Sequence, residues 1–257
     1  MPDPIYPAIS ANTLFHFTNR LENLLGILTN EFCPRFCLED FNFLQKKDAE
    51  RDDVLEWAVP MVCFCDLPLS QLGFHLSVYG DYGIGMSKEW GMKKGISPIL
   101  YVYQESLFVL QIGNLMAHAV AKKDDSDLSE KMVENIHGLT SFIKPYEGPF
   151  WRPSGTLPKV RFYNEREWRF VPQLQGNSFM EKNDFLDAEK LREENTKIAK
   201  AKISFEPNDI RYLIVRTEAE IVPLVNRIRE IKGRYSYDDV SLLSSRVISA
   251  EQIRFDF

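Results

Sequence analysis

The sequence predicts an α+β fold in a single domain, residues 1–257. Stretches with the composition of strands cluster along the chain, whereas a doubly wound fold would alternate each strand with a helix. A helical stretch at about residues 105–145, interrupted by the charge run KKDDSD, indicates an insertion between earlier and later strands. A hydrophobic content of 44% is enough for one sizeable core.

The chain begins with a strand and a helix. Residues 13–17, TLFHF, read as a short buried strand, and Asn19 can cap a helix that runs to Asn30. The leucines of this helix fall at helical spacing: Leu21, Leu24, Leu25 and Leu28. Residues 38–57 are charged and lack a clean period, so we expect a loop with some helix there.

The next elements surround a strand that contains glycines. VPMVCFCDLP is a strand that ends at Pro68, and LSQLGFHLSVYG is a helix stopped by Gly80. YGIGMSK is the glycine-containing strand, and KEWGMKKG forms a short helix before the β run PILYVYQ. These patterns predict strands close to one another in the first part of the chain.

The second part of the chain starts with a loop rich in Pro and Gly, KPYEGPFWRPSGTLP, which leads into a strand over YNEREWRFVP. Residues 173–200 are polar and favour helix. AKISF and RYLIVR are strands, and EAEIVPLVNRIREIKG is a helix that has to accommodate Pro223. SSRVISAEQIRFDF closes the chain.

Charge and hydropathy exclude several classes of protein. The net charge of −6 argues against a chain that binds polyanions over its whole surface. A local basic group still permits a nucleic-acid partner: Lys159, Arg161, Arg166 and Arg169. No apolar run approaches the roughly 18 residues needed to span a bilayer. The N-terminus lacks a secretory signal, so we expect a cytoplasmic protein without membrane contact.

The four cysteines invite a zinc-binding interpretation, because they fall in two close pairs: Cys33 and Cys37, and Cys63 and Cys65. The spacings differ from the C-x-x-C of ribbons and fingers. Cys63 and Cys65 also alternate within an apolar strand. Buried thiols in a reducing cytosol are therefore favoured over a metal site.

The segment EREWR offers two carboxylates to one face of a strand. Alternation puts Glu165, Glu167 and Arg169 on one side and Trp168 and Phe170 on the other, toward the core. Two interpretations stay open. The acidic face is either a solvent-exposed surface with modest ion pairs or part of an active site.

Two further stretches carry candidate functional residues. His16 stands at the end of the first strand, where polar side chains reach clefts, although a lone histidine in an apolar strand is usually a core residue. Tyr79 and Tyr82 flank the glycines of YGDYGIGMSK, whose backbone allows close approach of a ligand or of another strand.

The quoted stretches resemble a known family. LFHFTNRLENLLGIL, PMVCFCDLPLSQLGFHLSVYGDYGIGMSKEWG, PILYVYQES and FYNEREWRFVP are similar, in this order, to the AbiGi family of abortive phage-infection proteins. Members of that family are described as antitoxin partners in bacterial phage defence. The order of elements also resembles the ADP-ribosyltransferase superfold, DarT-like toxins included. That resemblance implies split antiparallel β-sheets with flanking helices.

The transferase resemblance implies roles for particular residues, with NAD as the substrate. Glu167 would be the catalytic acid and Glu165 would orient the acceptor, while His16 would hold the ribose. The NAD-binding residues would be His16, Phe17, Thr18, Tyr79, Tyr82 and Arg169. One departure is Gly85, which stands where many transferases carry an aromatic residue.

Two functions follow from these resemblances. The first is an NAD-dependent ADP-ribosyltransferase in phage defence that modifies nucleic acid or protein, with a cognate toxin or antitoxin as partner. The alternative is an antitoxin or partner-binding protein that has the fold and lacks turnover.

Overall fold

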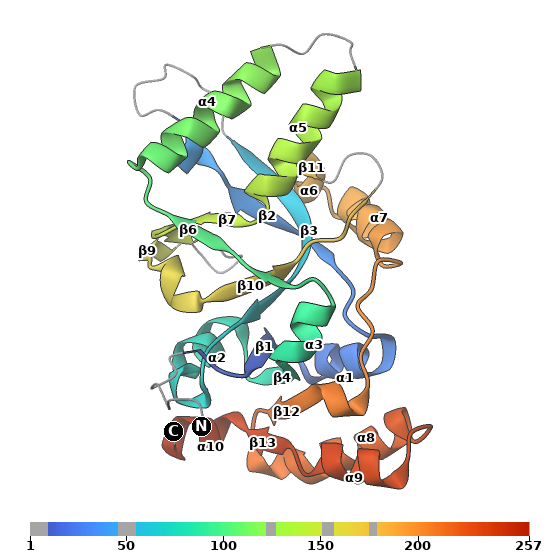
Figure 1. Cartoon of the computed structure of the whole chain (residues 1–257). Helices are drawn as coiled ribbons and strands as arrows, with labels where there is room; N and C mark the ends of the chain where they lie inside the picture. The colour runs from blue at the N-terminus through green and yellow to red at the C-terminus, as the bar shows by residue number, and fades with distance from the viewer. Residues whose placement is uncertain (1–9, 46–54, 122–126, 151–156, 175–178, 257) are drawn as a thin grey trace, which may run out of the picture.

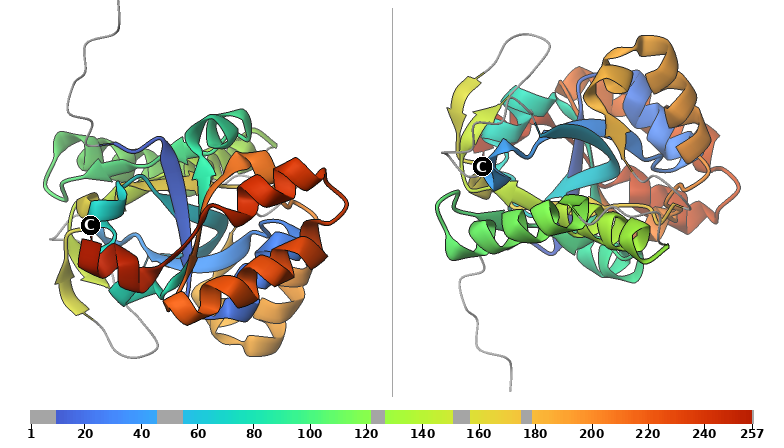
Figure 2. Two further views of the ribbon diagram at one scale, coloured as in Figure 1. Left: turned by 90° about the horizontal axis from the view of Figure 1, so that it is seen from below. Right: turned by 90° about the horizontal axis from the view of Figure 1, so that it is seen from above.

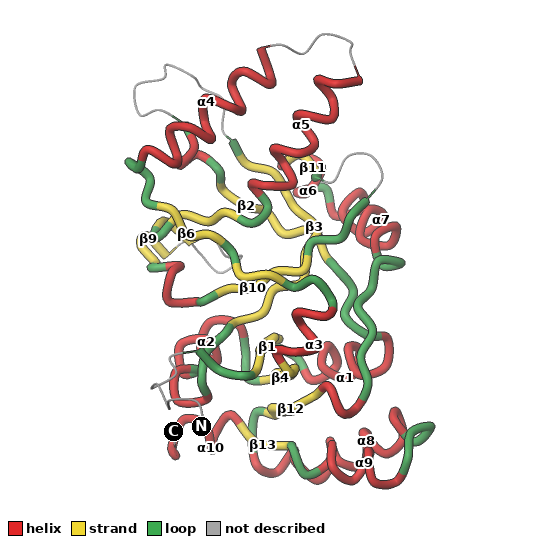
Figure 3. Tube along the Cα trace, viewed as in Figure 1, coloured by secondary structure: helices red, strands yellow, loops and turns green. Residues whose placement is uncertain are grey.

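A computed structural model describes residues 10–45, 55–121, 127–150, 157–174 and 179–256 of the chain. Strands run through the middle of the molecule, and helices lie at both ends and along the sides (Figure 3). The α+β class predicted from the sequence is confirmed. Within the described ranges, none of the helices combines the length and apolar character that crossing a bilayer requires.

A nine-stranded sheet forms the centre of the fold. Its path runs β13-β12-β4-β1-β3-β10-β5, and β2 and β11 also pair with β3. All its pairings are antiparallel except β12 with β13. The strands are β1 (Thr13–Thr18), β2 (Arg35–Asp40), β3 (Glu56–Cys65), β4 (Tyr82–Ser87), β5 (Ser97–Pro98), β10 (Glu167–Phe170), β11 (Met180–Glu181), β12 (Ile210–Val215) and β13 (Val247–Ser249).

Two small sheets and the helices surround this sheet. The small sheets are a parallel pair, β6 (Leu100–Val102) with β7 (Ile143–Pro145), and an antiparallel pair, β8 (Gly148–Phe150) with β9 (Leu157–Val160). The helices are α1 (Leu21–Asn30), α2 (Gly73–Tyr79), α3 (Lys88–Lys93), α4 (Leu107–Ala121), α5 (Asp127–Thr140), α6 (Lys182–Leu186), α7 (Ala188–Ile198), α8 (Ile221–Lys232), α9 (Tyr237–Ser244) and α10 (Ala250–Asp256).

The long strand β3 connects the two ends of the molecule. Its first half pairs with β2 and β11, and its last residues pair with β10 and β1. Helices α4 and α5 occupy one end and α8 to α10 the other (Figure 1). Seen from below, α8 to α10 lie across the end of the sheet near β12 and β13 (Figure 2). Helices α4 and α5 fall within the stretch predicted as an insertion.

Strand β4 has glycines where aromatic side chains of the neighbouring strand β1 leave no room for a Cβ atom. A Cβ at Gly85 would lie 2.8 Å from the ring of Phe15, and a Cβ at Gly83 would lie 2.9 Å from the ring of Phe17. Gly80 ends α2 with φ at 112°, a backbone conformation that L side chains rarely adopt. The glycine-containing strand is therefore shaped by its neighbouring strand.

Several predicted elements were wrong. Residues 38–57 were expected as a loop with some helix, but β2 extends to Asp40 and β3 begins at Glu56, while residues 46–54 lie outside the described part. Asn19 does not cap α1, whose N-cap is Arg20, without a side-chain hydrogen bond. The segment AKISF forms only an isolated bridge between Phe32 and Ile203. Helix α9 was not predicted.

Candidate functional site

The two carboxylates of EREWR lie in a buried group of charged residues, named here the Glu165–Glu167 cluster. Its members are Glu39, Lys144, Glu165, Glu167 and Arg169. The sequence predicted one continuous strand over this motif, but a 3₁₀ turn (Phe162–Glu165) comes first and Arg166 then has φ at 45°. β10 starts only at Glu167. Glu165 thus reaches the cluster through a turn, and the prediction of its strand position was wrong.

Arg169 is the centre of the cluster, and it is fully buried. Its Nε donates to Glu167 Oε1 at 2.6 Å, and its Nη2 donates to Glu39 Oε2 at 3.0 Å. Its Nη1 donates to the carbonyl oxygen of Ser141 at 2.8 Å. One guanidinium group therefore ties β10 to β2 and to the segment that follows α5.

Lys144 on β7 bridges the two carboxylates. Its Nζ donates to Glu165 Oε2 and to Glu167 Oε2, both at 3.0 Å. The same Nζ lies 4.6 Å from the ring centroid of Phe162. Lys144 has an exposed fraction of 9%, so this bridge is almost entirely shielded from water.

The protonation states in the cluster follow from these contacts. Burial alone would raise the pKa of Glu167, but Arg169 and Lys144 outweigh burial and hold that pKa well below its usual range. Burial would lower the pKa of Lys144, yet Glu167 and Glu165 raise it above its usual range. Glu167 is therefore ionised and Lys144 is charged at neutral pH.

Tyrosines complete the surroundings of the carboxylates. The hydroxyl of Tyr79 donates to Glu165 Oε1 at 2.8 Å, and the N–H of Glu167 donates to the hydroxyl oxygen of Tyr101 at 2.8 Å. Burial, followed by the charge of Glu165, raises the pKa of Tyr79. His75 lies beside Tyr79, with 5.5 Å between ring centroids, and burial lowers the pKa of His75 to about 4.

All four carboxylate oxygens of Glu165 and Glu167 accept hydrogen bonds from groups within the protein. The exposed fractions of the two residues are 3% and 7%. Neither carboxylate is offered to a ligand in this arrangement. The buried ion pairs of the cluster connect β2, β7 and β10, and this connection is named here the ionic lock.

The structure separates the predicted site residues into two groups. Tyr79, Glu165, Glu167 and Arg169 come together in or beside the cluster. His16 lies elsewhere, with Nδ1 2.8 Å from the carbonyl oxygen of Cys63 and its ring 5.5 Å from that of Phe32.

The other predicted NAD-binding residues also have local partners. The hydroxyl of Tyr82 donates to Glu220 Oε1 at 3.0 Å. The hydroxyl of Thr18 accepts from Asn23 Nδ2 at 2.8 Å. The ring of Phe17 lies 6.2 Å from that of His75, which connects it to the neighbourhood of Tyr79. His16, Tyr82 and Glu167 thus each have their own local partners, and the roles that the transferase resemblance implies for them stay predictions.

A cavity of about 610 Å³ opens beside the cluster. Among its lining residues are Glu39 and Lys144 of the cluster, the further acids Asp40, Glu56 and Glu147, and Lys182. Lys182 is paired with Glu56, and Lys144 is paired within the cluster. Among the described lining residues, no cation is left for the pyrophosphate of NAD. The cavity has the size of a small-molecule site, but its charge opposes a dinucleotide.

Comparison with known proteins agrees with the resemblance seen in the sequence. A family model described as "Putative abortive phage resistance protein AbiGi, antitoxin" matches residues 30–216. The chain belongs to the AbiGi family. The abortive phage resistance protein AbiGi of Lactococcus lactis subsp. cremoris is 27% identical over 248 residues, which cover 88% of this chain and 99% of that protein. No solved structure matches the chain, so the ADP-ribosyltransferase-like arrangement stays a prediction.

The range matched by the AbiGi model contains the entire Glu165–Glu167 cluster and both helices α4 and α5. Sequence reasoning missed three participants in or beside the cluster, Glu39, Lys144 and Tyr101. Each is a single polar residue within an ordinary strand or loop pattern, and nothing local distinguishes it. Only the pairing of β3 with β2 and β10 brings Glu39 to Arg169.

The cysteines of this AbiGi-family chain are all free. Burial raises the pKa of the Cys37 thiol to about 12, and burial also raises the pKa values of Cys63 and Cys65. Within the described ranges, no group of three or more His, Cys, Asp or Glu side chains is placed to hold a metal ion. The thiols of Cys37, Cys63 and Cys65 are therefore protonated at neutral pH and are poor metal ligands in that state.

Helix α4 presents a second feature, an apolar surface. Val109 is buried in the core beneath the helix, with Ile112 and Met116 packed against that core. On the remaining sides of α4, large apolar residues are exposed: Leu107 at 70%, Phe108 at 43%, Leu110 at 40% and Leu115 at 38%. These four residues are named here the α4 surface. An amphipathic surface helix would carry polar residues at such positions.

Proposed function

We propose that this AbiGi-family chain is the antitoxin of an abortive phage-resistance system and acts by binding a toxin protein. The family description and the name of the Lactococcus relative support a role in phage resistance. The α4 surface is the observation that carries the binding mechanism. Clustered large apolar side chains on a soluble fold are typical of a surface that docks another protein.

The position of the α4 surface favours a protein partner over internal packing. Helix α4 already packs against the core through Val109, which lies in one cluster with Phe41 and Trp57. The exposed leucines of α4 are therefore not needed to attach the helix to the core. Other large apolar residues of the elements before and after α4 are exposed as well: Leu100 at 48%, Tyr103 at 60% and Leu139 at 58%. A partner that covered this area would gain roughly 25 cal/mol for each Å² of apolar surface removed from water.

One observation favours an alternative function. Glu165, Glu167 and Tyr79 lie together near a cavity of about 610 Å³, which fits the residues expected of an NAD-dependent ADP-ribosyltransferase acting on nucleic acid or protein. For that chemistry Lys144 and Arg169 would have to release Glu167. The paired charges and the distant His16 make the antitoxin the better-supported function.

The deciding experiment is a growth assay in cells that express the toxin from the same phage-resistance system. The double variant Leu107→Ser with Leu110→Ser should fold as the wild type does and fail to rescue growth. The matched control changes two exposed apolar residues at the other end of the molecule, Val222 (67% exposed) and Leu242 (46% exposed), to Ser and should rescue fully.

The same assay tests the enzymatic alternative. The chain expressed alone should not be toxic, and the purified protein should not cleave labelled NAD. Toxicity of the chain alone, lost in a folded Glu167→Gln variant, would contradict the antitoxin proposal and favour the transferase.

A further inference from the structure

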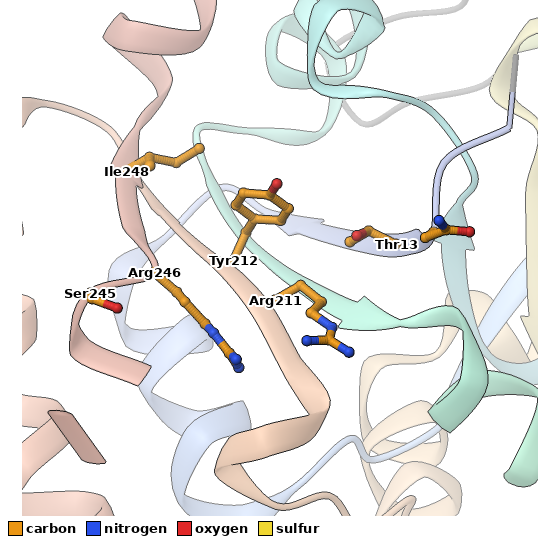
Figure 4. A pocket seen from close by; sticks show the side chains of 7 residues that line it. Thr13, Arg211, Tyr212, Ser245, Arg246 and Ile248 are labelled. Carbon is orange, nitrogen blue, oxygen red and sulfur yellow. The ribbon is translucent and has the colours of Figure 1, made fainter. Parts of the chain in front are cut away.

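A second pocket lies at the other end of the sheet, on the strands β12 and β13 and the start of β1 (Figure 4). Its volume is about 560 Å³. The lining residues are Asn12, Thr13, Arg211, Tyr212, Ser245, Arg246 and Ile248. None of them belongs to the Glu165–Glu167 cluster or to the α4 surface.

Two arginines far apart in sequence meet in this pocket. Arg211 is on β12, and Arg246 directly precedes β13, which pairs with β12 in parallel. Figure 4 shows both guanidinium groups extending to the same side of the pocket, away from the ring of Tyr212. Arg246 Nη1 donates to the carbonyl oxygen of Ile210, which fixes its direction. In the described part of the chain, neither guanidinium group has a carboxylate ion-pair partner.

The unpaired state of these arginines contrasts with other arginines near the same end of the molecule. Arg254 and Arg216 share Asp81, and Arg227 pairs with Glu230. In the pocket, burial lowers the pKa of Arg246 and the charge of Arg211 lowers it further. The carboxylate of Glu89 feels the charge of Arg211 but is itself paired with Lys93. Two like charges held together without a directly paired acid form a site that an anion would stabilise.

Polar groups add to the anion-binding character. Thr13 is 7% exposed, and its hydroxyl has no hydrogen-bond partner among the described residues, although it lines the pocket. Asn12 contributes an amide from the same segment. A hydroxyl and an amide beside two guanidinium groups match the several acceptor oxygens of one phosphate group.

The other side of the pocket is apolar and aromatic. Tyr212 and Ile248 line it, and the ring of Tyr212 stacks on that of Phe15 with 5.7 Å between centroids. The ring is therefore held in a fixed orientation and can receive a planar group. The pocket volume also falls within the range of small-molecule sites.

We infer that this pocket binds a nucleoside monophosphate, with the phosphate between Arg211 and Arg246 and the base against Tyr212 and Ile248. The arginine pair selects the phosphate, and the aromatic side distinguishes a nucleotide from inorganic phosphate. This site is independent of the proposed antitoxin role, because it lies at the opposite end of the molecule from α4 (Figure 1).

Calorimetric titration of the full chain tests the inference with four probes: AMP, inorganic phosphate, adenosine and a short single-stranded oligonucleotide. AMP should bind most tightly and adenosine not measurably. Arg211→Gln should weaken AMP binding by about 10-fold or more, because it removes one charge-assisted contact. Thr13→Val should also weaken AMP binding. The matched control Arg227→Gln, which removes a charge from an exposed ion pair, should leave the affinity unchanged.

Arg211 is the preferred variant because its side chain is exposed, whereas Arg246 also supports the backbone at Ile210. No binding of AMP, or equal binding by wild type and Arg211→Gln, would overturn the inference. Equal affinity for AMP and inorganic phosphate would overturn the role of Tyr212. If the oligonucleotide bound more tightly than AMP, and lost that affinity in Arg211→Gln, the inferred mononucleotide ligand would be wrong and the pocket would bind a polynucleotide.

Discussion

The side chains of His16 and Glu167 lie on opposite faces of the central sheet. Glu167 stands opposite Cys65 on β3, and Cys65 stands opposite Phe15 on β1. Residues directly opposite one another share a face, so His16, one residue after Phe15, points to the other side. Its ring accordingly packs against Phe64, at 5.8 Å between centroids. A ribose could not be held by both side chains at once.

The ionic lock at Glu167 should contribute to stability. In Glu167→Gln, Arg169 keeps its ion pair with Glu39 but loses the one with Glu167, whose Oε1 lies 2.6 Å from Arg169 Nε. Lys144 loses one of its two carboxylate partners. We expect the free energy of unfolding to fall by about 3 kcal/mol, because a buried charge is left partly unpaired. Urea unfolding followed by circular dichroism measures this change.

An exposed acid provides the control for this variant. Glu230 pairs with Arg227 at the surface, so Glu230→Gln should change the free energy of unfolding by less than about 0.5 kcal/mol. Equal stabilities of Glu167→Gln and the wild type would mean that the cluster does not hold β2, β7 and β10 together.

His75 should make the fold sensitive to acid. Burial lowers its pKa from 6.5 to about 4 in the folded state, so the unfolded chain binds more protons between these values. The free energy of unfolding therefore has its full value above the unfolded-state pKa of 6.5 and declines as the pH falls below it. The contribution of His75 to this loss at pH 5 is about 2 kcal/mol relative to neutral pH.

The measurement compares unfolding free energies at neutral pH and at pH 5 for His75→Gln and His118→Gln. The His75 variant should lose about 2 kcal/mol less on acidification than the wild type. His118 is exposed on α4, and its variant should behave as the wild type does. Identical acid dependence in all three proteins would contradict a neutral, buried His75.

Gly85 should be required for packing rather than for ligand binding. A Cβ at this position would lie 2.8 Å from the Phe15 ring and 2.9 Å from Thr13 Cγ2. Gly85→Ala should therefore destabilise the fold by about 1–3 kcal/mol. Gly26→Ala on α1, where no atom lies within 4 Å, should stabilise by about 0.5–1 kcal/mol. Thermal unfolding checks both, and an unaffected Gly85→Ala would contradict the packing argument.

Local patterns predicted much of this fold because they report on single elements. Trp168 and Phe170 pack against the main core, as alternation indicated. Gly80 ends α2 as predicted. Strand β2 was missed because it ends in two acidic residues, Glu39 and Asp40, which are more typical of a loop. The charge of Glu39 is tolerated because Arg169 pairs with it.

The candidate site was less predictable because it depends on pairing between distant strands. The motif EREWR indicated two important acids. It could not indicate that Lys144 and Arg169 form ion pairs with the carboxylate of Glu167. The face of His16 depends on the register of β1 against β3, which alternation within either strand does not specify. The α4 surface was present in the sequence as LFVL, within a stretch predicted only as helical.

The most direct test of the account is amide hydrogen exchange of the chain with and without its toxin. If the chain is an antitoxin that docks through the α4 surface, toxin binding should slow exchange in residues 107–121 and leave β10 unchanged. Slower exchange around Glu165 and Glu167 without any change in α4 would contradict this account, because the partner would then engage the cluster itself.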